Sequence, residues 1–163
     1  RVPFFYESLC MKKILIMGLP GSGKTTLARQ LAKRLKAVHW NADDVRANIN
    51  KDLGFSEADR IEQARRMGWL CDRAIEAGHW SIADFVCPTP ETRKAFGNAW
   101  IVWTDTIDKG RFEDTNKLFV PPEHYDYHID TKDALFWSKY LHEQLDFEEN
   151  PTLGKAIFLS EKL

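Results

Sequence analysis

The sequence is poor in cysteine and lacks the spacings that give cysteines a structural role. Its 163 residues include only Cys10, Cys71 and Cys87, an odd number, and no two form a CxxC pair. These facts argue against a disulfide framework or a zinc finger and predict a protein of the reducing cytoplasm. The chain also lacks an apolar run near the roughly 18 residues that span a bilayer, so we expect no membrane partner.

The sequence also lacks an excess of charge of one sign. It has 23 Lys and Arg against 24 Asp and Glu, for a formal net charge of −1. This balance gives no reason to expect a polyanion binder, so nucleic acid is not an expected partner. Residues 1–46 nevertheless carry nine Lys or Arg against three Asp or Glu. The positive charge is concentrated where the first motif lies.

The length and the 44% content of hydrophobic residues suit one compact domain. Residues 1–10 precede Met11 and lack the plan of a signal peptide, so we interpret them as an N-terminal extension. An ordinary extra segment is the alternative. The predicted domain covers residues 11–149, and residues 150–163 form a C-terminal tail with a predicted strand at 156–159.

Strand and helix patterns alternate along the domain. The apolar run Ile14–Met17, bounded by Gly18, predicts a buried strand. Further strands are predicted over 37–40, 80–86, 99–104 and 125–129, and helices over 24–36, 43–49, 57–77, 89–97 and 134–147. Ser56 and Thr131 are the predicted caps of the third and last helices. The alternation predicts a mostly parallel sheet with helices on both faces.

A glycine-rich segment between the first strand and the first helix matches G-x-x-x-x-G-K-[ST] without a gap. Its backbone N–H groups and the helix N-terminus favour phosphate oxygens, while Lys24 can reach the β- and γ-phosphates. The motif predicts ATP and Mg²⁺ as cofactors and a three-layer α/β/α P-loop fold of the nucleoside-monophosphate-kinase type. The predicted nucleotide-binding residues are Gly18, Leu19, Pro20, Gly21, Ser22, Gly23, Lys24, Thr25 and Thr26.

A magnesium site needs a carboxylate beside the phosphate loop. Asp84 ends the predicted apolar strand Trp80-Ser-Ile-Ala-Asp84, which is the Walker B pattern. Thr25 and Asp84 are therefore the predicted metal residues. The alternative for Asp84 is a polar residue at a strand end, satisfied by a cap.

A second group of polar residues follows the second predicted strand. Asp43, Asp44 and Arg46 stand at a strand-to-helix junction, the edge of an open α/β sheet where ligands bind. A carboxylate there can accept the proton of an attacking hydroxyl, and Arg46 can hold an anionic acceptor. The alternative is a helix cap made by Asp with a solvated Arg.

Residues 52–62 read D-L-G-F-S-x-x-D-R-x-E, and Phe85-Val-Cys-Pro88 with Arg93 follows later. Together with the phosphate loop and the segment 43–46, these residues resemble the adenylylsulfate (APS) kinase family. That family makes 3′-phosphoadenylyl sulfate (PAPS) from ATP and APS. The resemblance runs from Ile14 to about Arg93, roughly half of the chain, and the D-L-G-F-S-x-x-D-R run is its most specific part.

The resemblance implies a role for each matching residue. Asp43 corresponds to the catalytic carboxylate near the 3′-hydroxyl, Arg46 and Arg60 to residues that grip the phosphosulfate, and Phe55 to the aromatic that stacks on adenine. A core staple is the alternative for Phe55. The family commonly dimerises, which implies a homodimer. The predicted substrate-binding residues are Asp43, Arg46, Phe55, Arg60, Gln63 and Phe85.

The sequence also departs from the family pattern. The D-G-D-N element reads Asn41-Ala-Asp-Asp44, and Asp84 replaces a small residue before Phe85. The later F-T-G-I-D-x-P-Y-E element is missing, and residues 110–122 stand in its place.

Within that segment, Arg111 is interpreted as a lid cation that acts with Lys24 and Asp43 in catalysis, with a surface loop as the alternative. Two further functions stay open. One is a kinase of another hydroxyl, on a nucleotide, a polynucleotide 5′ end or a small metabolite. The other is a nucleotide-binding regulatory module without turnover.

Overall fold

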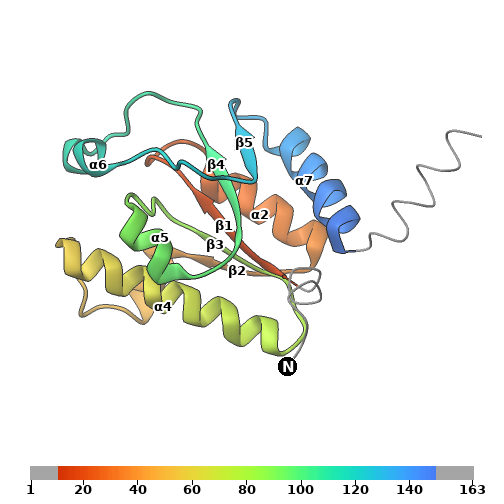
Figure 1. Cartoon of the computed structure of the whole chain (residues 1–163), viewed down its shortest axis with the longest axis horizontal. Coiled ribbons are helices and arrows are strands. Elements are labelled where there is room, and N and C mark those ends of the chain that lie inside the picture. Colours follow the sequence, from red (N-terminus) through yellow and green to blue (C-terminus); the bar gives the residue numbers. More distant parts are fainter. Residues whose placement is uncertain (1–10, 150–163) are drawn as a thin grey trace, which may run out of the picture.

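The computed structural model describes residues 11–149 and contains a five-stranded sheet (Figure 1). The strands are β1 (Lys13–Met17), β2 (Val38–Asn41), β3 (Ser81–Asp84), β4 (Trp100–Thr104) and β5 (Tyr127–Ile129). Their order is β2-β3-β1-β4-β5, and every neighbouring pair is parallel, which confirms the predicted parallel sheet. The predicted extension, the tail and the strand at 156–159 lie outside the described residues.

Helices cover both faces of the sheet, as the alternation predicted. Helices α2 (Lys24–Leu35) and α7 (Ala134–Glu149) pack together on one face, and α4 (Glu57–Glu76) and α5 (Pro90–Phe96) pack together on the other (Figure 1). Two short helices, α3 (Ala42–Asn48) and α6 (Glu113–Leu118), lie in the connections that follow β2 and β4. No helix within residues 11–149 has the length and apolarity to cross a membrane.

Strand β1 divides the hydrophobic core in two because its side chains alternate between the faces. Ile14 and Ile16 join one cluster with residues of α2 and α7, while Leu15 and Met17 join a second with residues of α3, α4 and α5. All four of these side chains are fully buried. A central strand buried on both faces explains why its sequence is a continuous apolar run.

The helix ends confirm one predicted cap and correct another. Ser56 Oγ accepts a hydrogen bond from Asp59 N at 3.1 Å, which confirms the cap of α4. The prediction for Thr131 was wrong, because Asp133 Oδ1 accepts the bond from Phe136 N at 3.1 Å. Helix α6 was not predicted, since its six residues are too few to show an apolar period.

All five parallel strands point their carboxyl ends to the same edge of the sheet. Strand β1 runs into the glycine-rich loop, β2 into α3, and β3 into the connection that holds Phe85. Loops that follow the strands of such a sheet form its ligand-binding edge. The fold therefore brings the predicted phosphate loop and the predicted acceptor residues to one edge.

Candidate active site

The phosphate loop is shaped by its contacts with the end of β4. Gly18 has a φ of 149°, and a Cβ there would lie 2.3 Å from Thr104 Oγ1, so no larger residue fits. The Thr104 and Ser22 hydroxyls are hydrogen-bonded at 2.7 Å, and Thr106 Oγ1 donates to Ser22 O at 2.7 Å. The loop is therefore fixed by residues that lie outside its own motif.

Lys24 lies at the centre of the predicted catalytic group. It is 8% exposed, and its Nζ donates to the Leu19 carbonyl at 2.9 Å. Burial lowers the pKa of Lys24 to about 8, Asp84 and Asp43 oppose that shift, and Arg111 adds to it. Asp43, Asp84 and Arg111 therefore all interact electrostatically with the lysine.

The segment that carries Arg111 lies against the phosphate loop. A Cβ at Gly110 would lie 2.9 Å from Pro20 Cδ, and one at Gly21 would lie 3.8 Å from Ile107 Cδ1. Asn116, in α6, holds Gly110 through two hydrogen bonds of 2.8 and 2.9 Å. This packing brings the segment of Arg111 beside the loop, and the role of Arg111 as a lid cation stays a prediction.

The two predicted metal residues are in direct contact. Thr25 Oγ1 donates to Asp84 Oδ1 at 2.9 Å, and Asn41 Nδ2 lies 3.2 Å from Thr25 Oγ1 and 3.0 Å from Asp84 Oδ1. Asp84 is 1% exposed, ends β3 and is bonded by side chains, while the cap of the following helix is Thr89. The role of Asp84 at a metal stays a prediction. A hydroxyl and a carboxylate are ligands that suit Mg²⁺.

The described residues contain no group of three His, Cys, Asp or Glu side chains that could hold a metal alone. Mg²⁺ is commonly bound by one or two protein oxygens together with substrate phosphates and water. The pair Thr25 and Asp84 fits that kind of site, in which the metal arrives with a nucleotide.

A hollow of about 140 Å³ lies beside the loop, between α2 and the connection from β5 to α7. Its lining includes Gly23 and Thr26, which were predicted, and Thr131, Lys132 and Trp137, which were missed. Trp137 Nε1 donates to Thr131 Oγ1 at 2.8 Å and closes one side. The carboxyl end of β5 was a usable signal for these residues, because it shares the ligand-binding edge.

On the acceptor side, Asp43 is exposed and makes no hydrogen bond or ion pair with any described residue. The cap of α3 is Asn41, whose Oδ1 accepts from Asp44 N at 3.0 Å. The interpretation of the Asp pair as a helix cap is therefore wrong. The Asp43 carboxylate is available to a ligand.

Two arginines hold an exposed aromatic ring near Asp43. The guanidinium carbons of Arg46 and Arg60 lie 4.5 and 5.6 Å from the centre of the Phe55 ring, which is 68% exposed. This exposure rules out the core-staple interpretation of Phe55. Burial lowers the pKa of Arg46, with a further contribution from Arg60.

Neither Arg46 nor Arg60 has a carboxylate salt bridge in the described part of the chain. Arg46 Nη1 donates to Gly54 O at 2.8 Å, and Arg60 Nε donates to Phe55 O at 3.0 Å. The nearby Arg66 differs, because it binds both oxygens of Asp52 at 2.8 and 2.9 Å. Arg46 and Arg60 therefore retain the free donors that an anion needs.

The last two predicted substrate residues lie further inside. Gln63 is 2% exposed, accepts from Asn50 Nδ2 at 2.7 Å and donates to Ala42 O at 3.3 Å. Phe85 is half-buried, with its ring centre 5.7 Å from that of Phe96. Gln63 therefore supports the backbone next to Asp43, and direct substrate contact by either residue stays a prediction.

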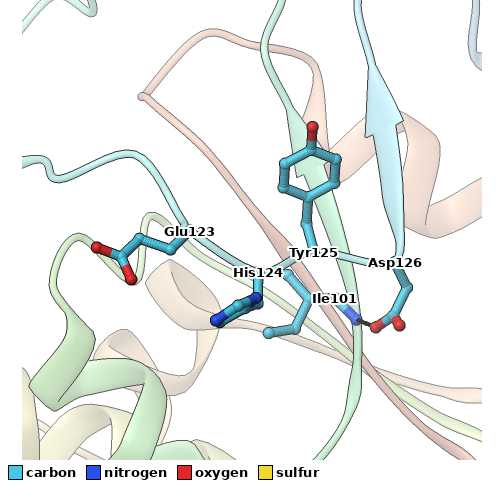
Figure 2. A pocket seen from close by; sticks show the side chains of 5 residues that line it. All are labelled: Ile101, Glu123, His124, Tyr125 and Asp126. Carbon is cyan, nitrogen blue, oxygen red and sulfur yellow. Dashed lines mark hydrogen bonds between the residues drawn. The ribbon is translucent and has the colours of Figure 1, made fainter.

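A separate hollow of about 560 Å³ lies over β4 and the segment before β5. It is lined by Ile101, Glu123, His124, Tyr125 and Asp126, and Figure 2 shows the Glu123 and Tyr125 side chains pointing apart. Asp126 Oδ2 accepts from Ile101 N at 2.8 Å. None of these residues belongs to the predicted site.

Comparison with protein families agrees with the geometry. The family model for adenylylsulphate kinase matches residues 11–102, more than half of the chain. The chain belongs to this family. The match includes the phosphate loop and the acceptor residues and ends before Thr104 and Arg111.

Curated adenylyl-sulfate kinases share this part of the sequence. The enzyme of Bacillus licheniformis is 41% identical over 85 residues, which are 49% of this chain and 43% of that protein. The bifunctional enzyme NodQ of Azospirillum brasilense is 39% identical over 83 residues, 48% of this chain and 13% of that protein. The matched segment thus spans less than half of these relatives.

The fold similarity extends further than the sequence similarity. The Mycobacterium tuberculosis APS kinase CysC, solved with AMPPNP and APS, superposes with a TM-score of 0.73 at 22% identity, covering 83% of this chain and 98% of that one. A hexameric APS kinase from Thiobacillus denitrificans gives 0.67 at 26% identity, covering 84% and 29%. The family fold therefore continues beyond the residues that the family model matches.

Proposed function

We propose that this member of the adenylylsulphate kinase family transfers the γ-phosphoryl group of ATP to the 3′-hydroxyl of APS. The observation that carries the proposal is the exposed Phe55 ring with two guanidiniums near it that lack carboxylate partners, on the same side of the site as the unpaired carboxylate of Asp43. A flat ring suits a purine, and the paired cations suit the phosphosulfate of APS. The Lys24 loop at the same sheet edge suits the triphosphate.

The reaction follows from these positions. The 3′-hydroxyl oxygen forms a bond to the γ-phosphorus while the bond from that phosphorus to the β,γ-bridging oxygen breaks, and ADP leaves. Asp43 accepts the hydroxyl proton and passes it to solvent. Lys24 and Arg111 stabilise charge on the transferring group, and Arg46 and Arg60 orient the acceptor.

Thr25 and Asp84 are the residues that would hold Mg²⁺. When bound, this ion neutralises charge on the β- and γ-phosphates. The solved relative that holds AMPPNP and APS supports both substrates as candidates for this chain.

A direct assay tests the acceptor. The protein is incubated with labelled ATP, Mg²⁺ and APS, and the products are separated by anion exchange. PAPS is the expected product. Steady transfer to another hydroxyl without PAPS would keep the kinase and reject APS, which is the alternative that the departures after residue 102 favour. Nucleotide binding without transfer to any acceptor in a panel would favour a regulatory module.

We also propose that the chain self-associates, as the resemblance to a dimerising family implied. Helix α7 exposes Leu135, Phe136 and Phe147, and apolar side chains gathered on one element favour a protein partner. The hexameric state of the Thiobacillus relative supports this proposal. Light scattering after size exclusion should give at least twice the mass of one chain.

A further inference from the structure

The carboxylate of Asp84 is buried and bonded to side chains from three segments. Oδ1 accepts from Thr25 Oγ1 at 2.9 Å and from Asn41 Nδ2 at 3.0 Å, while Oδ2 is bonded to His39 Nε2. Among the described residues, no Arg or Lys lies within salt-bridge distance of Asp84, and Lys24 interacts with it only at longer range. Burial of a carboxylate is costly unless charge and hydrogen bonds compensate it, so a buried carboxylate held in this way favours a cation as ligand.

The register of the sheet relates Asp84 to Asn41. The two residues end neighbouring parallel strands and are direct partners in the pairing of β2 with β3. Both contact the hydroxyl of Thr25. The same space beside Thr25 can thus be reached by a carboxylate from either strand end.

The sequence places the acid on β3 in this chain. Asn41 stands where the D-G-D-N pattern has its first Asp, and Asp84 stands where the pattern has a small residue. Asn41 makes two hydrogen bonds as a neutral amide. Its nitrogen donates to Asp84, and its oxygen accepts from Asp44 N and caps α3. The acidic group beside Thr25 is therefore the one at the end of β3.

His39 completes this arrangement. It lies two residues before Asn41 on β2, its side chain is 16% exposed, and its Nε2 is bonded to the Asp84 oxygen that faces away from Thr25. Because an ionised carboxylate only accepts, Nε2 is the donor. With Oδ2 held by His39, Oδ1 is fixed toward the Thr25 hydroxyl.

We infer that Asp84, at the end of β3, is the metal-side carboxylate of this kinase, and that His39 is the positioning residue that aims it at the Mg²⁺ of the bound nucleotide. The inference rests on the proposed ATP-dependent function but not on the identity of the acceptor. Partners that orient a metal-binding carboxylate commonly affect metal affinity about 10–100-fold.

Calorimetric titration with AMPPNP, with and without Mg²⁺ and in the absence of any acceptor, tests the inference. The measured quantity is the dissociation constant of AMPPNP without Mg²⁺ divided by that with Mg²⁺. A general loss of nucleotide affinity changes both constants and cancels in this ratio. Asp84→Asn should reduce the ratio to near one, and the exchanged variant Asn41→Asp/Asp84→Asn should recover most of it. Where Asp84→Asn does not fold, the exchanged variant decides, since it keeps one acid between the strands.

His39 is tested in the same titration. His39→Leu should reduce the ratio about tenfold, and His39→Gln, which keeps a donor, should restore it. The matched control is His128→Leu, which removes the second His–Asp pair, His128 with Asp105 at 2.9 Å, and should leave the ratio unchanged.

Any of three results would overturn the inference. Asp84→Asn could keep the ratio of the unmodified protein, the exchanged variant could fail to recover it, or the two His39 variants could give equal ratios. Mg²⁺-dependent binding that follows these expectations without PAPS formation would overturn the proposed acceptor alone.

Discussion

The two halves of the candidate site differ in how their side chains are held. On the donor side, Lys24, Thr25 and Asp84 are tied to one another or to backbone in a mostly buried network. On the acceptor side, Asp43 is unpaired among the described residues, and Phe55 is exposed. The donor half is therefore held in place by its own contacts, while the acceptor half is an open surface.

This contrast predicts different kinds of loss upon substitution. Removing a buried, preorganised charge affects the chemical step, because such groups stabilise the transition state without reorganisation. Removing an exposed recognition group affects binding of one substrate. The predictions below use this difference, in order of decreasing effect.

The largest loss is expected for Lys24→Ala. The substitution removes the only cation that the phosphate-loop motif itself supplies, so phosphoryl transfer should fall by about 10²–10³-fold or more. Initial rates at saturating ATP and APS measure the effect. Lys33→Ala, on the exposed side of the same helix α2, is the matched control and should retain the rate. Similar losses in Lys24→Ala and Lys33→Ala would mean that the buried position of Lys24 in the donor half has no special effect on the chemical step.

Asp43→Asn separates chemistry from binding. Loss of a general base costs about 10²–10⁴-fold in rate, whereas affinity for AMPPNP should stay within about twofold because Asp43 lies on the acceptor side. Asp44→Asn, the exposed neighbour in the same helix, is the control. An intact rate in Asp43→Asn would contradict the assignment of this carboxylate as the proton acceptor.

Arg46→Ala and Arg60→Ala should mainly raise KM for APS. Hydrogen bonds to charged groups contribute about 1.5–3 kcal/mol, which corresponds to roughly 10–100-fold. Arg65→Ala is the matched control in α4, because Arg65 pairs with Glu62 at 2.7 Å and has no contact with Phe55. A fall in kcat with unchanged KM for APS would mean that these arginines act in the chemical step, like the donor half, and do not mainly bind the acceptor.

The smallest effect concerns the core beneath the open acceptor surface. Burial raises the pKa of Cys71 to about 11 and that of Cys87 to about 12. Since the thiolate is the reactive form, a Cys10→Ser variant should show almost no thiol reaction with DTNB at pH 8 until it is denatured. Rapid reaction of the folded variant would mean that the core around Cys71 and Cys87, beneath the acceptor half, is readily exposed to solvent.

Much of the fold could be predicted from the sequence because its signals are local. The apolar run at 14–17, the helix that follows the glycine-rich motif and the Ser56 cap all depend on neighbouring residues, and all three are confirmed. Helix α6 and the Asp133 cap were missed. A six-residue helix shows no period, and Thr131 and Asp133 are both residue types that cap helices.

The site was predicted only where a motif names its residues. Lys24, Thr25 and Asp43 follow from such patterns, and the structure brings them to one sheet edge. The bond between His39 and Asp84, by contrast, joins the strands β2 and β3, which are far apart in the sequence. Such contacts arise from strand order and register, which no local pattern in one sequence specifies.

The contact of Gly18 with Thr104 changes what counts as the phosphate-binding motif. Thr104 lies two residues beyond the segment that the family model matches, yet its hydroxyl fixes Ser22 and its atoms fill the space beside Gly18. The functional motif is thus discontinuous, with eight letters on one strand-to-helix turn and a ninth at the end of another strand. A related sequence with a bulky residue at that ninth position would keep every letter of the pattern and lose the loop that the pattern describes.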